Sequence, residues 1–186
     1  FPTGVAAATQ LFTGYGAGFF DFDNDTLLDL FQANGHMMDN VELYFDNVTF
    51  AEPGQILRNR GDGTFEDVTA RVGPDLAVPM VGRGSAFLDW NGDGWIDLAV
   101  VVAGGRAKLF RNRPVEGMHF LDVLLEGVRS NRDGFGAKLT LRAGSTARFR
   151  EARGASGYAS QSERILHFGL GAAARVDLLE IRWPSG

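Results

Sequence analysis

Four aspartates lie within nine residues in the stretch DFDNDTLLD, residues 21–29. Counted from the first aspartate, the carboxylates occupy positions 1, 3, 5 and 9, and they belong to Asp21, Asp23, Asp25 and Asp29. Alternate side chains of a tight loop can converge on one point, whereas the intervening side chains point away. Carboxylate oxygens are preferred ligands of hard divalent cations, and Ca²⁺ tolerates an irregular loop better than Mg²⁺ does. The spacing therefore predicts a calcium site.

The same spacing recurs in the stretch DWNGDGWID, residues 89–97. Oxygen-bearing side chains again occupy positions 1, 3, 5 and 9, and they belong to Asp89, Asn91, Asp93 and Asp97. At position 7 of each loop, the backbone carbonyl of Leu27 or Trp95 would add a ligand. Carboxylates a few Å apart repel each other by about 1 kcal/mol or more per pair at an effective dielectric constant of about 20. The two clusters therefore predict two structural Ca²⁺ ions, one in each loop.

The sequence allows two other interpretations of these loops. An EF-hand needs a glutamate at position 12 and flanking helices, but position 12 is Gln32 or Val100 and both flanks have the pattern of strands. The remaining alternative is a solvated acidic turn that hydrogen-bonds to itself, because Asp and Asn favour turns. Two copies in matching context favour the calcium site over that turn.

Position 6 distinguishes the two loops, since it is Thr26 in the first and Gly94 in the second. If this position requires a positive φ, a β-branched residue there costs on the order of 1–2 kcal/mol. The sequence therefore predicts that the second loop is the better-formed site.

The acidic loops belong to longer repeats, residues 14–35 and 82–105. Each repeat runs from a glycine-rich stretch through apolar residues and the acidic turn to an apolar strand. A similar phrase follows each, ILRNRGDGTFEDVT after the first and AKLFRNRP after the second. Such internal repeats are typical of stacked or radial architectures. Residues 36–55 have the composition of a loop inserted into the first repeat.

Beyond Pro114 the pattern changes to five alternating runs with turn residues between them. They are HFLDVLLEG, AKLTLRAG, ARFREAR, RILHFGLG and VDLLEIRW, and each predicts a strand. No stretch of the chain predicts a helix longer than about two turns. We therefore expect an all-β protein with a domain boundary near residue 115.

The composition excludes several classes of protein. The 186 residues include no cysteine, so neither a disulfide nor a thiolate metal site is possible. A net charge of −5 argues against a nucleic-acid partner, and no apolar run approaches the roughly 18 residues of a membrane span. The chain starts at Phe1 and stops after RWPSG, which indicates a processed chain or a piece of a longer one.

The repeats GAGFFDFDNDTLLDLFQANGH and GRGSAFLDWNGDGWIDLAVV resemble the FG-GAP/VCBS repeats of integrin-α-like β-propellers. The later segment resembles the ASPIC/UnbV domain, because SNRDGFGA, SQ, HFGLG and RWPSG occur in order. The combination resembles the cartilage-acidic-protein-1-like family. This resemblance implies partial β-propeller blades with calcium loops over residues 1–114, followed by a small antiparallel β-sandwich-like domain over residues 115–186.

The resemblance also implies calcium ligands on the eight Asp and Asn side chains named above, and an extracytoplasmic protein that is secreted, periplasmic or at the cell surface. About two repeats are present, whereas such propellers close with about seven blades. We expect a non-enzymatic binding, adhesion or scaffolding module with a protein or polysaccharide partner, within a longer chain or a larger assembly. The alternative is an accessory or catalytic module of a polysaccharide-active enzyme. For that role Asp133 and Glu163 are available as a carboxylate pair, but nothing in the sequence places them together.

Overall fold

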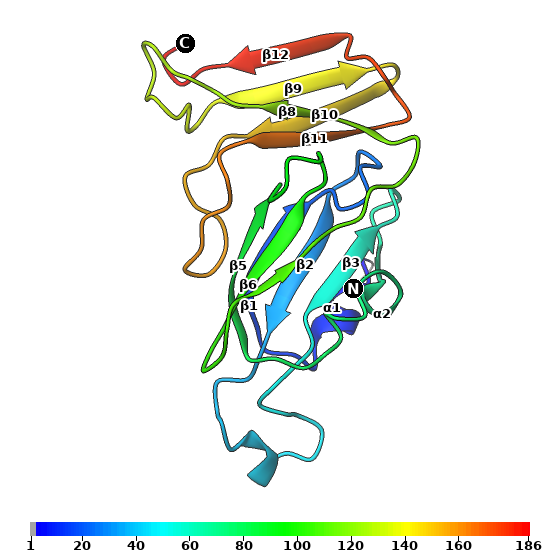
Figure 1. Ribbon diagram of the computed structural model, residues 1–186, viewed down its shortest axis with the longest axis vertical. Coiled ribbons are helices and arrows are strands. Elements are labelled where there is room, and N and C mark those ends of the chain that lie inside the picture. The colour runs from blue at the N-terminus through cyan, green and yellow to red at the C-terminus, as the bar shows by residue number, and fades with distance from the viewer. Residues whose placement is uncertain (1–2) are drawn as a thin grey trace.

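The computed structural model describes residues 3–186, and antiparallel β-strands dominate it (Figure 1). The first repeat forms a four-stranded sheet in the order β1-β2-β3-β4. Its strands are β1 (Gly14–Phe20), β2 (Asp29–Asn34), β3 (Gln55–Asn59) and β4 (Phe65–Asp67). The second repeat forms a three-stranded sheet in the order β5-β6-β7. Its strands are β5 (Gly82–Leu88), β6 (Asp97–Val102) and β7 (Lys108–Phe110).

The two sheets are built alike around their acidic loops. Phe20 pairs with Asp29 across the first loop, and Leu88 pairs with Asp97 across the second. Each loop therefore closes a hairpin in the same register, between the first and second strand of its sheet. This equivalence confirms the repeat and is consistent with propeller-like blades.

The two blades approach closely where β1 meets β5, because both strands are rich in glycine. A Cβ atom on Gly16 would lie 2.6 Å from the carbonyl oxygen of Arg83 and from the amide nitrogen of Ser85. Only glycine allows the two backbones to come this near. The apolar side chains behind these strands form the core shared by the blades, and they include Phe20, Phe31, Phe87, Leu98 and Val100.

The second region contains the five strands expected from its alternating runs. They are β8 (His119–Val123), β9 (Lys138–Ala143), β10 (Thr146–Glu151), β11 (Leu166–Gly171) and β12 (Leu178–Arg182). They form one sheet in the order β10-β9-β12 and another in the order β11-β8. A separate apolar core joins the two sheets and includes Leu139, Leu141, Leu166 and Phe168. The all-β fold with a small antiparallel sandwich is confirmed.

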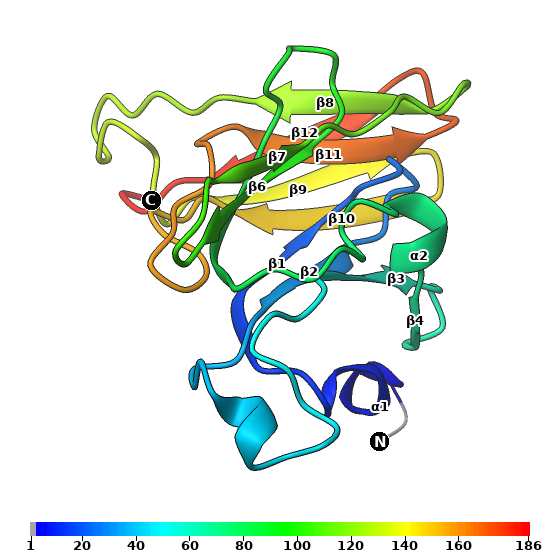
Figure 2. The same ribbon diagram turned by 60° about the horizontal axis from the view of Figure 1, so that its bottom comes forward.

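Helices contribute little to residues 3–186. The helical segments are α1 (Val5–Thr9), the 3₁₀-helix η1 (Val41–Leu43) and α2 (Thr69–Val72). Within the described part of the chain, none of them has the length and apolar character that crossing a membrane requires. Figures 1 and 2 show the strands of the second region stacked across one end of the blades. The acidic loops lie at that end, so the second region covers them.

Candidate metal centre

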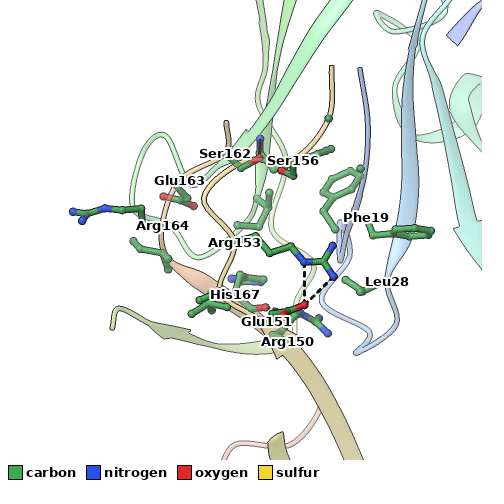
Figure 3. A pocket seen from close by; sticks show the side chains of 18 of the residues that line it. Phe19, Leu28, Arg150, Glu151, Arg153, Ser156, Ser162, Glu163, Arg164 and His167 are labelled. Atoms are coloured by element: carbon green, nitrogen blue, oxygen red, sulfur yellow. Dashed lines mark hydrogen bonds and ion pairs between the residues drawn. The ribbon is translucent and has the colours of Figure 1, made fainter. Parts of the chain in front are cut away.

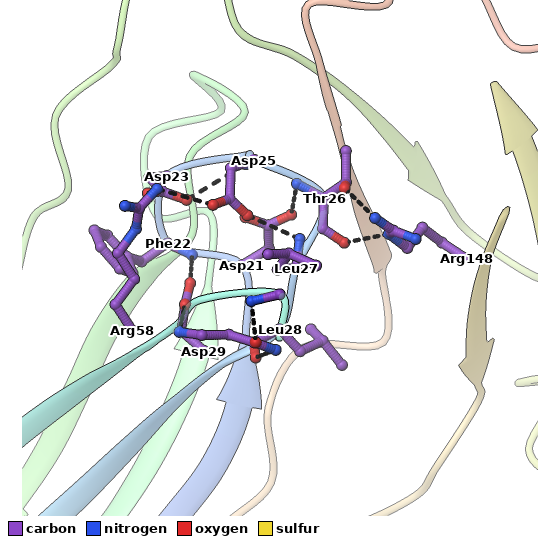
Figure 4. Close-up of polar contacts among 12 residues, drawn as sticks. Asp21, Phe22, Asp23, Asp25, Thr26, Leu27, Leu28, Asp29, Arg58 and Arg148 are labelled. Carbon is purple, nitrogen blue, oxygen red and sulfur yellow. Dashed lines mark hydrogen bonds and ion pairs between the residues drawn. The ribbon is translucent and has the colours of Figure 1, made fainter. Parts of the chain in front are cut away.

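The first acidic loop, residues 21–29, brings three carboxylates to one point (Figure 4). One oxygen each from Asp21, Asp23 and Asp29 lies within 4.8 Å of the others. Asp21 and Asp29 are buried. Asp25 faces Arg58, whose guanidinium lies 2.9 Å from Asp25 Oδ2 and 2.9 Å from Asp23 Oδ2. The structure thus gathers all four predicted carboxylates in one loop, with three of them converging.

Backbone amides fix the orientation of these carboxylates. The amide of Thr26 donates to Asp21 Oδ2 at 2.9 Å, and the amide of Leu27 donates to Asp25 Oδ1 at 2.9 Å. Asp29 accepts from the amide of Asn59 at 2.8 Å with its Oδ1, and from the amide of Phe22 with its Oδ2. These bonds hold the side chains in place before any cation arrives.

One buried oxygen in this loop has no donor. Asp21 is 2% exposed, and its Oδ1 atom finds no hydrogen-bond partner among the described residues. A buried carboxylate oxygen without a partner costs free energy unless a proton or a cation satisfies it. The three converging carboxylates and this unsatisfied oxygen fit a hard divalent cation with oxygen ligands.

Burial and mutual repulsion also raise the pKa values of the carboxyl groups in the first loop. Burial, reinforced by the charge of Asp25, raises the pKa of Asp21 from 3.8 to about 8. Burial raises the pKa of Asp29 to about 7, against the opposing effect of the Asn59 amide. The pKa of Asp23 is raised as well, mainly by burial. Without a cation, the folded loop therefore retains protons that free aspartates release.

In the metal-free protein, the unfolding free energy is expected to fall as the pH rises from about 5 to about 8. Protons on Asp21 and Asp29 stabilise the folded state fully below the unfolded pKa of 3.8. This stabilisation is lost as the pH rises through the folded pKa values of about 7 and about 8. Urea unfolding in excess EDTA at several pH values measures the slope.

A cation that replaces these protons should remove or reverse that slope, so the same series in CaCl₂ is the comparison. The Asp21→Asn variant has one fewer titrating carboxyl and should show a smaller decline in EDTA. A metal-free protein whose stability rises from about pH 5 to about pH 8, equally in wild type and variant, would contradict the assignment.

The second acidic loop, residues 89–97, reproduces the hydrogen bonds of the first. The amide of Gly94 donates to Asp89 Oδ2 at 2.7 Å, and the amide of Trp95 donates to Asp93 Oδ1 at 3.0 Å. Asp97 accepts from the amide of Asn112 at 2.6 Å and from that of Trp90 at 3.1 Å. The two loops are therefore equivalent in backbone and in the position of their first, fifth and ninth side chains.

The carboxylates of the second loop converge less than those of the first. Among residues 3–186, Asp89, Asp93 and Asp97 do not form a cluster comparable to that of Asp21, Asp23 and Asp29. Asp89 Oδ1 accepts from the amide of Asp93 at 3.1 Å, so both of its oxygens have donors. The geometry thus favours the first loop, opposite to the ranking predicted from position 6. The carbonyls of Leu27 and Trp95 as ligands, and Asn91 as a ligand, stay predictions.

The backbone at position 6 has the predicted positive φ in both loops, +83° at Thr26 and +80° at Gly94. The strain at Thr26 is offset from the second region, because Arg148 binds this residue twice. Its Nε donates to the Thr26 carbonyl at 2.6 Å, and its Nη2 donates to Thr26 Oγ1 at 2.5 Å. The penalty predicted for a β-branched residue is therefore partly balanced by the contact to Oγ1, which a glycine would not make.

Replacing Thr26 by glycine should separate the strain from the Arg148 contact. In an Arg148→Ala background, Thr26→Gly is expected to raise the unfolding free energy by about 1 kcal/mol, because only strain is removed. In the wild-type background the gain should be smaller, since the Oγ1 hydrogen bond is lost as well. Urea unfolding of the four proteins forms a double-mutant cycle. Equal gains in both backgrounds would show that Arg148 does not offset the strain.

Sequence reasoning missed four residues that complete the loops. Asn59 and Asn112 donate backbone amides to Asp29 and Asp97, and their side chains bind the carbonyls of Leu28 and Ile96. Arg58 and Arg111 approach the acidic side chains, with Arg111 3.5 Å from Asp93 Oδ2. The signal was present in the repeated phrase Arg-Asn-Arg, residues 58–60 and 111–113, that follows each repeat.

Asn24, at position 4 of the first loop, binds the second region as Thr26 does. Asn24 is fully buried; its carbonyl accepts from the amide of Gly171 at 2.8 Å, and its Oδ1 lies 2.6 Å from His167 Nε2. The amide group of the same side chain donates to the carbonyl of Gly94 at 3.1 Å. Asn24 therefore ties together both acidic loops and β11.

A cavity of about 540 Å³ lies between β1 and the segment from β10 to β11 (Figure 3). Glu151 in this cavity is bound by Arg153, and Glu163 accepts from the amide of Asp89 at 2.8 Å. Asp133, considered with Glu163 as a carboxylate pair, is instead bound by Arg164. Arg164 directly follows Glu163 in the chain, and the two carboxylates have different partners. The carboxylate pair and the enzymatic alternative stay predictions.

Comparisons with known proteins agree with the resemblance noted in the sequence. Residues 21–100 match the family model described as FG-GAP-like repeat, and residues 127–186 match the one described as ASPIC and UnbV. The chain is 28% identical over 176 residues to cartilage acidic protein 1 of Homo sapiens, and equally to that of Mus musculus. These matches confirm the resemblance to both kinds of unit and to cartilage acidic protein 1.

The alignments cover the chain and its relatives unequally. They include 89% of this chain, but 24% of the human protein and 25% of the mouse protein. The chain thus spans about a quarter of the length of the curated relatives it matches.

Proposed function

We propose that this chain, which combines FG-GAP-like repeats with an ASPIC and UnbV region, is a calcium-stabilised extracytoplasmic binding module. Its calcium is structural, and the module acts without catalysis in binding, adhesion or scaffolding. Similarity to proteins named cartilage acidic protein 1 supports the extracytoplasmic setting. The partner is a protein or a polysaccharide, and the module works within a longer chain or a larger assembly.

The observation that carries this proposal is the convergence of three carboxylates, one of which has a buried oxygen without a donor. Asp21, Asp23 and Asp29 supply the converging oxygens, and Asp21 Oδ1 is the unsatisfied one. When bound, Ca²⁺ would neutralise these charges and supply the missing partner. Asp29 also accepts from the amide of Asn59 at the end of β3, so a filled site would link β1, β2 and β3. Binding free energy would thereby become folding free energy.

Direct titration of the metal-free chain tests this proposal. Calorimetry with CaCl₂ should show heat of binding at submillimolar to millimolar concentration, the range of extracellular calcium modules. Asp29→Asn should abolish or strongly weaken the first-loop component. Asp62→Asn serves as the control, because Asp62 is an exposed aspartate whose Oδ1 accepts within its own turn. Absence of any calcium-dependent heat, or an equal loss in both variants, would overturn the proposal.

A further inference from the structure

The connection between β2 and β3, residues 35–54, is far longer than a blade of this kind requires. In the second blade, residues 103–107 join the equivalent strands β6 and β7. The blades otherwise match in register and in the hydrogen bonds of their acidic loops. Figure 1 shows residues 35–54 projecting from the end of the molecule opposite the second region. We call this segment the protruding loop.

The protruding loop is ordered by its own contacts. At its base, the amide of His36 donates to the carbonyl of Phe50 at 2.9 Å, and Arg83 binds the carbonyls of Gly35 and His36. At its tip, η1 packs the fully buried Val41 inward. Glu42 accepts from the amide of Phe50 at 2.7 Å and closes the tip. The segment is therefore a compact loop of the kind that often carries function.

This internal order leaves large apolar side chains in solvent. Leu43 is 78% exposed, Tyr44 63%, Phe45 55% and Met37 70%. Scattered exposed apolar residues are ordinary, but several in succession on one projecting element mark an interaction site. Because the backbone is already fixed, little conformational entropy would be lost when these side chains are buried by a partner.

The charge of the protruding loop indicates which kind of partner it can bind. Asp39, Glu42 and Asp46 lie among the exposed apolar residues, and the sequence has no lysine or arginine between His36 and Arg58. Within residues 3–186, Asp39 and Asp46 form no ion pair. A second copy of this chain, with a net charge of −5, would bring like charges together. Anionic lipid would repel the loop for the same reason.

We propose that the protruding loop docks into an apolar groove flanked by lysine or arginine side chains on a partner protein. Leu43, Tyr44 and Phe45 fill the groove, and Asp39 and Asp46 face its basic rim. Complementary charge of this kind raises the association rate and selects the partner, while the buried aromatic side chains supply most of the affinity. The inference deepens the proposed binding function and rests on it.

A random peptide library displayed on phage, selected against the full chain, supplies a defined probe. The expected peptides combine apolar residues with Lys or Arg. A synthetic peptide from the selection should bind the Leu43→Ser/Tyr44→Ser/Phe45→Ser variant at least about tenfold more weakly than wild type. The Asp39→Lys/Asp46→Lys variant should bind several-fold more weakly and lose most of the salt dependence. Val128→Ser is the matched control, because Val128 is an exposed apolar residue of the second region.

The outcomes separate this inference from the proposed function. All variants should keep the wild-type circular dichroism spectrum and melting temperature, because the altered side chains are exposed. Selected peptides that bind all variants equally, or that carry no excess of Lys and Arg, overturn the docking surface but leave a binding module. Self-association or vesicle binding that is lost in the triple variant assigns the loop to a second copy or a membrane and overturns the stated partner. If no peptide is selected at all, docking on a partner protein is overturned, whereas the proposed module with a polysaccharide partner stands.

Discussion

Excess EDTA is expected to lower the melting temperature of this protein by about 6–10 °C relative to CaCl₂ at 100 times its dissociation constant. Binding at that concentration stabilises the folded state by about 2.7 kcal/mol. For a chain of this size, 1 kcal/mol corresponds to about 2–4 °C. The effect is large because the cation would remove the repulsion among Asp21, Asp23 and Asp29 and satisfy the buried Asp21 Oδ1. Scanning calorimetry in the two buffers measures it.

Variants locate the site of this effect. Asp21→Asn should remove most of the difference between CaCl₂ and EDTA, whereas Asp62→Asn should leave it intact. Asp89→Asn should have a smaller effect than Asp21→Asn, since Asp89 already accepts two backbone amides. An unchanged melting temperature in EDTA would show that calcium does not stabilise the protein.

Gly169→Ala is expected to destabilise the protein by about 2–3 kcal/mol and to weaken calcium binding. A Cβ atom on Gly169 would lie 2.7 Å from the Cα atom of Asn24, and nearer still to Asp21 Oδ2. Asn24 is held by Gly171, His167 and Gly94, so its backbone cannot move without breaking those bonds. Overpacking of this kind typically costs about 1–3 kcal/mol. Urea unfolding and a calcium titration measure the two effects.

Gly154→Ala is the matched control for this prediction. A Cβ atom on Gly154 would lie 3.5 Å from the ring of Phe135, an ordinary contact, so the change should stay within about 0.5 kcal/mol. If both alanine variants were equally stable, or if Gly169→Ala left calcium binding intact, β11 would not be packed on the first loop as described.

The strands were clearly predictable where side chains alternate and less clearly where glycine dominates. The five runs after Pro114 became β8 to β12, and DLFQAN and DLAVVV became β2 and β6. The stretches GYGAGFF and GRGSAFL, which precede the acidic loops, had a weaker strand pattern because they are rich in glycine, and they form β1 and β5. Glycine is normally unfavourable in a strand. Here it is required by the close approach of the blades at Gly16 and Gly82, a constraint that lies outside local sequence.

The candidate site was predictable in its ligands and not in its surroundings. Carboxylates at alternate positions can be recognised within a stretch of nine residues. The convergence of three carboxylates in residues 21–29 agrees with the calcium site predicted from that spacing. The contacts of Asn24 with His167 and of Thr26 with Arg148 join residues more than a hundred positions apart. Such contacts depend on how the second region packs on the blades. The contact of Thr26 with Arg148 also explains why threonine is tolerated at position 6, where the second loop has Gly94.

A crystal structure of the chain grown in CaCl₂ would show whether the first loop binds calcium. We expect an ion in the first loop, at about 2.3–2.6 Å from oxygens of Asp21, Asp23 and Asp29, with Asp21 Oδ1 among its ligands. Retention of the metal-free side-chain arrangement at saturating calcium, with no ion between these three carboxylates, would contradict it.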